Sequence, residues 1–261
     1  MFIPLHDRNA LRHIRFQYVT FGLIVANVAT YILSVLALPE NTMNETVFSL
    51  GFIPAIVFDY AVLDPSLILV PPDVTVLTYS FLHNDLIHLG TNMLFLWVFG
   101  DNVEDAMGHV RFLIFYLLCA IAGAYFHGLV GPQSQLPLIG ASGAVSGVVA
   151  AYLMLHPKVR VWVLVFMRFP LPLPAYIPLL LWIGQQFVML ATDFGSNVSW
   201  GAHVGGILAG ALLVLVLRRR GVPLFDRTIV TPRSVEHKEM PPQTAPATLP
   251  SPTRQTVHWG R

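Results

Sequence analysis

Two residues with the chemistry of a hydrolase lie inside apolar stretches of this sequence. Ser142 occurs in a Gly-Ala-Ser-Gly segment, and His203 occurs in a Trp-Gly-Ala-His-Val-Gly-Gly segment. A serine hydroxyl is a weak nucleophile until a base removes its proton, so a Ser–His pair is the smallest unit that activates it. Polar side chains are costly in hydrocarbon, and where they occur they usually have a function. The pair therefore predicts hydrolysis carried out within a membrane.

Further polar residues are suited to support that reaction. Attack of a hydroxyl on an amide carbonyl produces an oxyanion, which needs hydrogen-bond donors already in place. His88 and Asn92 are four residues apart and would share one helix face. We expect them to form an oxyanion hole with the backbone N–H of Ser142. Gly140 and Gly143 flank the serine and are expected to line the substrate site, because they present no side chain to the substrate backbone.

Each of these residues also has a purely structural interpretation. A serine in a Gly/Ala-rich span commonly bonds back to its own helix, and Asn92 would by itself hold two helices together. Helix packing alone does not explain why a histidine lies as far into its apolar stretch as the serine lies into another. Metal binding by His83, His88 and His203 is an alternative, but no H-E-x-x-H motif accompanies them. We therefore predict neither a metal nor a cofactor.

Composition places the chain among membrane proteins. Charged residues make up 11% of the sequence, against about 25% in soluble domains, and hydrophobic residues make up 55% with a mean hydropathy of +0.64. Six apolar stretches approach the length needed to cross a membrane. They lie at about 16–38, 87–100, 111–128, 136–155, 173–191 and 198–217. The predicted fold class is an all-α membrane protein with a bundle of six transmembrane helices.

The basic residues predict the orientation of these spans. With six spans, all fifteen Lys and Arg residues fall on one side of the membrane. This asymmetry predicts that both termini are cytoplasmic. The basic N-terminus and the long apolar run after it indicate an uncleaved signal anchor. We therefore expect a bacterial inner membrane, with a mitochondrial or other organellar membrane as the alternative. Topology accounts for the basic residues, so no nucleic-acid partner is predicted.

Three regions are expected along the chain. They are a basic N-terminus at 1–15, a membrane domain at 16–217 and a Pro-rich tail at 218–261. The tail has too few large apolar residues to offset the entropy of ordering, so we expect it to be disordered. The apolar, Pro-containing outer segment at 39–86 predicts short amphipathic helices in the membrane interface. Cys119 lies in the middle of a span and is expected to be a small core residue.

The candidate residues share a predicted depth, because the second, fourth and sixth spans all start from the outer face. At 1.5 Å per residue, Ser142 would lie roughly 9 Å beyond Leu136, and His203 roughly 7–8 Å beyond Val198. Small residues recur along both helices and predict that their backbones pack closely. These residues are Gly143 and Gly147 in the fourth span, and Gly201, Ala202, Gly205, Gly206 and Gly210 in the sixth.

Taken together, these motifs resemble the rhomboid family of intramembrane serine proteases over about 15–217. The motifs are Gly-Ala-Ser-Gly, Ala-His-Val-Gly-Gly, His83 with His88-x-x-x-Asn92, and the turn at 100–108. The resemblance implies that Ser142 is the nucleophile and His203 the general base, with His88 and Asn92 in the oxyanion hole. It also implies a structural role for Glu104, transmembrane protein substrates cut near their outer ends, and a lateral opening beside the fifth span with a cap loop near 192–197.

One position departs from the family pattern. Well-known members carry an aromatic residue one turn after the serine, where it stacks on the catalytic imidazole, and this chain has Ser146 there. The resemblance therefore implies that something else orients His203, either a different ring or the Ser146 hydroxyl. The outer segment also lacks the Trp-Arg pair of the family, since it contains no arginine.

Two other classes of function are open to the same scaffold. A non-catalytic membrane chaperone or trafficking factor would share the fold, but inactive relatives typically lack the serine or the histidine. A proton-coupled transporter would need acidic residues for a relay, and the fourth and sixth spans carry none. The favoured partners are transmembrane protein substrates and the lipid bilayer, and no sequence feature fixes an oligomeric state.

Overall fold

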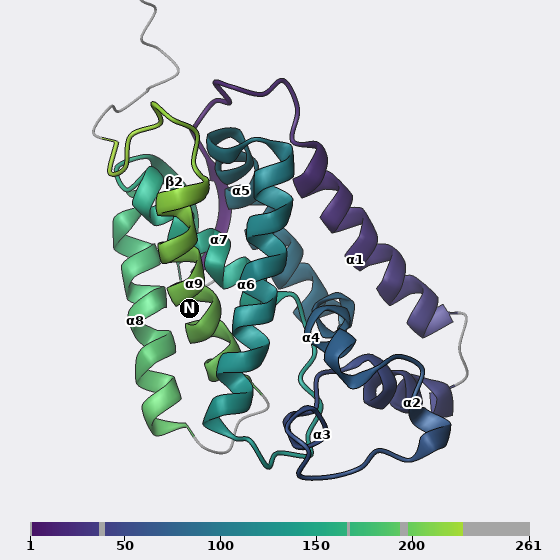
Figure 1. The fold of residues 1–261 in the computed structure, drawn as a ribbon. Coiled ribbons are helices and arrows are strands. Elements are labelled where there is room, and N and C mark those ends of the chain that lie inside the picture. Colours follow the sequence, from purple (N-terminus) through teal and green to yellow (C-terminus); the bar gives the residue numbers. More distant parts are fainter. Residues whose placement is uncertain (1, 37–39, 166–167, 194–197, 227–261) are drawn as a thin grey trace, which may run out of the picture. The chain divides into compact units, whose positions relative to one another are not determined.

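The structure is a computed structural model that describes residues 2–36, 40–165, 168–193 and 198–226. Figure 1 shows that most of this chain is helical, which confirms the predicted helical bundle. The long helices are α1 (Tyr18–Leu36), α5 (Leu86–Met107), α6 (His109–Val130), α7 (Ser142–Leu155), α8 (Tyr176–Thr192) and α9 (Trp200–Leu217). By length and composition, α6 and α9 are long and apolar enough to cross a membrane.

The segment between α1 and α5 forms a series of short helices, as its sequence predicts. They are α2 (Glu40–Leu50), α3 (Pro54–Val57), η1 (Pro65–Leu67), η2 (Pro72–Val74), α4 (Thr75–Thr78) and η3 (Tyr79–Phe81). Prolines open α3, η1 and η2, where the missing N–H costs nothing because the first turn has no acceptor for it. Two fully buried aromatic residues, Phe52 and Tyr79, hold this segment against the long helices.

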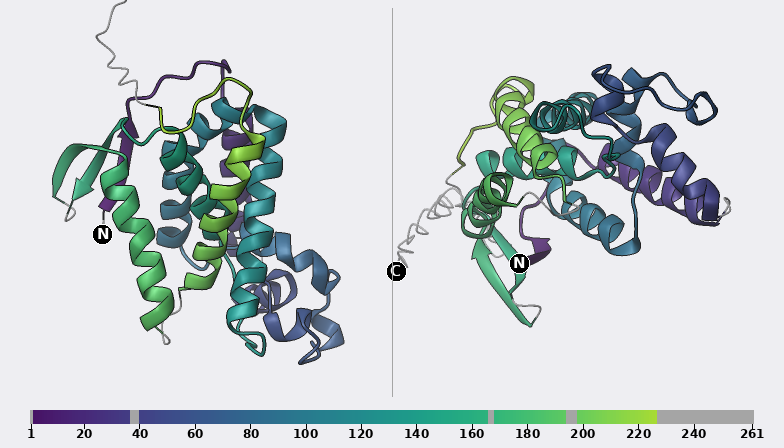
Figure 2. Two further views of the ribbon diagram at one scale, coloured as in Figure 1. Left: turned by 60° about the vertical axis from the view of Figure 1, so that its left-hand side comes forward. Right: turned by 90° about the horizontal axis from the view of Figure 1, so that it is seen from below.

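A small sheet is present that the all-α prediction did not include. Its strands are β1 (Phe2–Asp7), β2 (Arg160–Val165) and β3 (Phe169–Pro174), antiparallel in the order β1-β2-β3. Figure 2 shows the hairpin of β2 and β3 extending beside α8, with β1 next to it. Val161 and Val163 are fully buried at alternate positions, the period of two expected for a strand. Pairing between distant segments, not an unbroken apolar run, creates this sheet.

The long helices run in alternating directions. We call the end of the bundle where α5, α7 and α9 begin the site end. The opposite end, called the basic end, holds the segments with Arg8, Arg12 and Arg218. The backbone N–H of Arg219 bonds to the carbonyl of Ala106 at the basic end, which ties the segment after α9 to the end of α5.

Helix α7 starts later than the sequence suggests. The predicted span from residue 136 is wrong at its start, because residues 131–141 are not helical and α7 begins at Ser142. Phe52 and Leu138 exchange two backbone hydrogen bonds of 3.0 and 2.8 Å, and the N–H of Gly140 bonds to the Tyr79 carbonyl. Irregular backbone is tolerated at such a position when protein covers it. The non-helical segment at 131–141 therefore determines how far Ser142 lies from the end of the bundle. That distance cannot be obtained by counting residues along a helix.

Helices α7 and α9 approach so closely that only glycine fits between them. A Cβ atom on Gly206 would lie 1.9 Å from the carbonyl oxygen of Gly143, and one on Gly210 would lie 2.3 Å from that of Gly147. These distances confirm the predicted close packing of the fourth and sixth spans. The two backbones are in direct contact over more than one helical turn.

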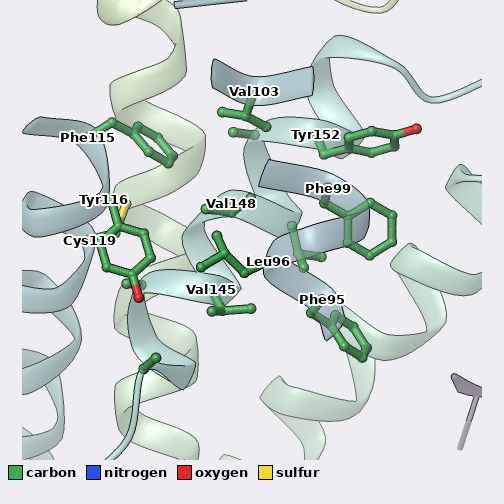
Figure 3. Packing of buried hydrophobic residues seen from close by; sticks show 14 of the residues in the cluster. Phe95, Leu96, Phe99, Val103, Phe115, Tyr116, Cys119, Val145, Val148 and Tyr152 are labelled. Carbon is green, nitrogen blue, oxygen red and sulfur yellow. The ribbon is translucent and has the colours of Figure 1, made fainter. Parts of the chain in front are cut away.

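Helix α6 packs against both of these helices. Gly205 faces α6, since its Cβ position lies 2.5 Å from the Cβ of Phe126. Cys119 is fully buried, and its sulfur lies 2.5 Å from the Cβ position of Gly147. The prediction that Cys119 is a core residue is confirmed. The core beside it is filled mainly by α5, α6 and α7, as Figure 3 shows with Phe99 and Tyr116.

A buried carboxylate organises the basic end. Glu104 is fully buried and accepts hydrogen bonds from the N–H groups of Val19 and Thr20, at 3.0 and 2.8 Å, and from the Thr20 hydroxyl. The ring of His109 is 2.5 Å away. A negative charge at a helix N-terminus is favourable, because the first N–H groups lack partners within the helix. Glu104 thus caps α1 from the end of α5, which is the structural role that the resemblance implied.

A second buried carboxylate lies on β1. Asp7 accepts hydrogen bonds from the Tyr152 hydroxyl at 2.7 Å and from the Asn102 amide at 3.0 Å. Burial raises the pKa of Asp7 from 3.8 to about 6, although the bond from Tyr152 and the nearby His6 oppose the shift. A carboxyl with a raised pKa stabilises the fold most when it is protonated.

Substitution of Gly206 by alanine is expected to lower the free energy of unfolding by about 1–3 kcal/mol, because the new methyl group would overlap a backbone carbonyl. Thermal unfolding in detergent measures the change. Gly22→Ala is the matched control, since the Cβ position of Gly22 has no atom within 4 Å. Equal melting temperatures for the two variants would contradict the packing described above.

Asp7→Asn is expected to reduce the pH dependence of stability. In the wild type, the contribution of Asp7 is full below pH 4 and is lost as the pH rises through about 6. The two-unit shift in the pKa corresponds to about 3 kcal/mol of the free energy of unfolding. The wild type should lose this amount between pH 4 and pH 7, and the variant should not. Unfolding curves at both pH values test this, and an unchanged pH dependence in the variant would show that Asp7 does not titrate in this way.

Candidate active site

Ser142 is the first residue of α7, at the site end of the bundle. The first N–H groups of a helix have no acceptor in the preceding turn and carry the positive end of the helix dipole. The backbone around the serine hydroxyl is therefore suited to stabilise negative charge. Ser146, one turn later, donates its hydroxyl to the Ser142 carbonyl at 2.6 Å.

His203 lies in the first turn of α9. It follows Ala202, whose carbonyl oxygen lies 3.3 Å from the Cβ position of Gly143, the residue after the serine. The candidate nucleophile and the candidate base thus flank the contact at which α7 and α9 approach each other. The structure brings their two helices together as the sequence predicted.

Three side chains hold the imidazole of His203. The Oε1 atom of Gln186 is 2.8 Å from its Nδ1 atom. The ring of Trp182 stacks on it at 6.3 Å and 28°, and Trp200 meets it edge-on at 5.8 Å and 89°. The expectation that a different ring orients His203 is therefore correct. The Ser146 hydroxyl does not do so, because it is bonded to a backbone carbonyl.

Gln186 is a candidate site residue that the sequence analysis missed. The signal was present, because two adjacent glutamines, Gln185 and Gln186, interrupt the apolar fifth span. Only the fold separates them, since Gln186 is 2% exposed and Gln185 lies on the exposed face of α8.

The candidate oxyanion residues lie on the first turns of α5. Asp85 caps this helix by accepting bonds of 2.8 Å from the N–H groups of Ile87 and His88. The Nε2 atom of His88 lies 2.6 Å from the Cβ position of Gly140, so only glycine leaves room for the ring. Gly140 has φ +115°, which independently favours glycine.

Asn92 is buried, and its amide nitrogen donates to the His88 carbonyl at 3.1 Å. This bond lies within α5 and does not join two helices, which is what the structural interpretation of Asn92 predicted. An amide nitrogen carries two N–H groups, so the bond uses only half of the donor capacity of Asn92. Its position one turn below His88 is compatible with a second bond to a reacting group.

His83 lies beside His88, with their rings edge-to-face at 4.9 Å. Burial lowers the pKa of His83 to about 4, so this residue is neutral at physiological pH. A neutral, buried imidazole packed on His88 fixes the position of that ring. It adds no charge next to the reaction centre.

His127, near the end of α6, has a specific hydrogen-bond partner. Its Nδ1 atom is 2.7 Å from the Ser199 hydroxyl oxygen. That oxygen also accepts a bond of 3.2 Å from the Ala202 N–H and so caps α9. His127 therefore helps to fix the helix that carries His203.

Of the cap loop expected near 192–197, residues 194–197 lie outside the described residues. At its edge, the Trp200 indole donates to Asp193 at 3.0 Å. The expected disordered tail lies, from residue 227 onward, outside the described residues as well.

The family model "Rhomboid domain" matches residues 73–220, more than half of the 261 residues. The mitochondrial Rhomboid protein 1 of Saccharomyces cerevisiae is 32% identical over 143 residues, or 53% of this chain and 40% of the relative. The Rhomboid protease GluP of Bacillus subtilis is 31% identical over 155 residues, or 59% of this chain and 28% of the relative.

These relatives correct one expectation and establish another. RHOMBOID-like protein 12 of Arabidopsis thaliana, 29% identical over 56% of this chain and 46% of its own length, is also named as mitochondrial. So is the human presenilin-associated rhomboid-like protein. The predicted bacterial inner membrane is therefore wrong, since these similarities point to mitochondria. The N-terminal apolar run interpreted as a signal anchor was a poor guide to location. The match over most of the bundle shows that the chain belongs to the rhomboid family.

Proposed function

We propose that this chain is an intramembrane serine endopeptidase that uses Ser142 as the nucleophile and His203 as the general base. The observation that supports the proposal is the close contact of α7 and α9, the two helices that carry these residues in their first turns. The hydrogen bond between Gln186 and His203 supports it further, because it leaves Nε2 to face away from α8.

In the first step, the Ser142 oxygen forms a bond to the carbonyl carbon of a substrate peptide. Its proton passes to Nε2 of His203, and the carbonyl π electrons move onto the oxygen to give a tetrahedral oxyanion. The Ser142 N–H at the start of α7 is one donor to that oxyanion. The side chains of His88 and Asn92 supply the others.

In the second step, the carbon–nitrogen bond breaks and the amine leaves with the proton held by His203. An ester between Ser142 and the acyl part of the substrate remains. A water molecule then gives a proton to His203 and attacks the ester carbon. The bond between that carbon and the Ser142 oxygen breaks, and the serine oxygen takes the proton back from His203 as the acid product leaves. A Ser–His pair therefore balances every proton in the reaction without a metal.

The substrate class follows from the location of the site. Exposed apolar side chains such as Leu180 and Leu181 cover much of α8, which suits contact with lipid or with another apolar helix. We propose that substrates are membrane proteins with a transmembrane helix, cut near the site end. The name of one relative, the Rhomboid protease GluP of Bacillus subtilis, identifies that relative as a protease. We also propose a mitochondrial membrane, following the names of the yeast, Arabidopsis and human relatives.

The alternative is a non-catalytic chaperone or trafficking factor on the same scaffold. A protein that only binds its partners needs neither a buried hydrogen-bond acceptor for the Nδ1 atom of His203 nor a helix that begins at a serine. Labelling with a serine-directed fluorophosphonate separates the two functions. A protease should be labelled at Ser142, whereas a chaperone should not react there.

Ser142→Ala is expected to lower the rate of cleavage of a model transmembrane substrate by at least about 10³-fold, because the nucleophile is lost. The rate is measured with purified protein in proteoliposomes. Ser146→Ala is the matched control: its hydroxyl lies one turn away, is bonded to a backbone carbonyl and should be dispensable. Equal loss in both variants, or none in either, would refute the assignment of Ser142.

Asn92→Ala is expected to lower kcat by about 10²-fold with a small change in KM, because an oxyanion donor acts mainly in the transition state. Steady-state kinetics in the same proteoliposomes separate kcat from KM. A rise in KM at constant kcat would instead indicate that Asn92 contributes to substrate binding or helix packing alone.

A further inference from the structure

Gln186 is a polar residue among the buried residues of α8. The buried residues of α8 are Pro178, Leu179 and Gln186, and Gln186 is 2% exposed. Burying an amide costs free energy unless its polar atoms are hydrogen-bonded. Both ends of this amide do have partners, since Nε2 donates to the Trp182 carbonyl at 2.9 Å and Oε1 lies 2.8 Å from His203.

These two contacts fix which way the amide points. The Trp182 carbonyl can only accept a hydrogen bond, so the amide nitrogen must face it. The amide oxygen must then face His203. Because an amide oxygen can also only accept, the Nδ1 atom of His203 must carry the hydrogen. The neutral imidazole is left with its lone pair on Nε2.

We propose that Gln186 is a positioning residue for the general base. It holds neutral His203 in the Nδ1–H tautomer, which directs the basic Nε2 atom to the Ser142 hydroxyl. This inference deepens the proposed protease function and rests on it for its catalytic meaning. The tautomer itself is a property of the folded protein and is measurable without any substrate.

Two rings complete the support. Trp182 stacks on one face of His203 and also supplies the carbonyl that orients Gln186. Trp200 contacts the imidazole edge-on. The rings restrict tilt of the imidazole, whereas only the hydrogen bond distinguishes its two nitrogen atoms. Stacking alone would leave the tautomer undetermined.

The partner of the imidazole is a neutral amide and not a carboxylate. An isolated carboxylate would be costly at this position, because Gln186 is buried. A neutral acceptor orients the histidine without strongly raising its basicity. Replacement by glutamate should therefore keep the orientation and alter the pH profile.

Kinetics of three variants test the proposal. Gln186→Leu removes the acceptor and should lower kcat at least about 10-fold with little change in KM. Gln186→Glu should recover kcat at high pH and shift the acidic limb of the profile upward by about one pH unit or more. Gln185→Leu, on the exposed face of α8, is the matched control and should retain the wild-type profile. Identical profiles for the leucine and glutamate variants at position 186 would overturn the proposal.

The tautomer is read directly by NMR of protein labelled with ¹⁵N-histidine in detergent micelles. The His203 signals are identified as those missing from His203→Ala. The wild type should show Nδ1–H, and Gln186→Leu should lose this preference. An Nε2–H tautomer in the wild type would overturn the proposal even if the variant failed to fold. If the Ser142→Ala variant still cleaved substrate, the proposed protease function would be refuted. The NMR spectra would still show whether Gln186 accepts a hydrogen bond from Nδ1 of His203.

Discussion

The site depends on the absence of side chains between α7 and α9. Where Gly206 meets the Gly143 carbonyl, a single Cβ would be 1.9 Å from the oxygen, so any other residue would force the helices apart. Ser142 and His203 each lie next to this contact in sequence. A displacement of about 1 Å is enough to impair a reaction that depends on alignment. The packing of the glycines is therefore also a condition for the proposed reaction.

A second principle appears at both ends of the bundle: the buried side chains of Glu104, Asp7 and Gln186 meet complementary hydrogen-bond partners. Glu104 accepts from the first N–H groups of α1, and Asp7 accepts from Tyr152 and Asn102. Gln186 meets His203 and a backbone carbonyl. In an interior of low dielectric constant, such contacts are strong when complete and costly when broken. They fix the register of helices whose apolar faces would otherwise pack in several ways.

The departure at Ser146 has a structural explanation. A serine at this position bonds back to its own helix and leaves one face of the imidazole without the ring that other rhomboids place there. Trp182 occupies a stacking position from α8 instead. The orientation of His203 thus comes from the fifth long helix and not from the helix that carries the serine. Since Gln186 lies on the same helix, α8 controls both the tilt of the base and its tautomer.

The sequence alone was sufficient for the helical bundle and for the close contact of the two helices that carry Ser142 and His203. These features follow from local signals: long apolar runs, polar residues where water is absent, and glycines spaced by a helical turn. The start of α7, the three-stranded sheet and the contact of Gln186 with His203 were decided by tertiary structure. Each depends on segments far apart in the chain, such as Phe52 with Leu138 or β1 with β2. No local pattern distinguishes Gln186 from Gln185, because burial against another helix is what separates them.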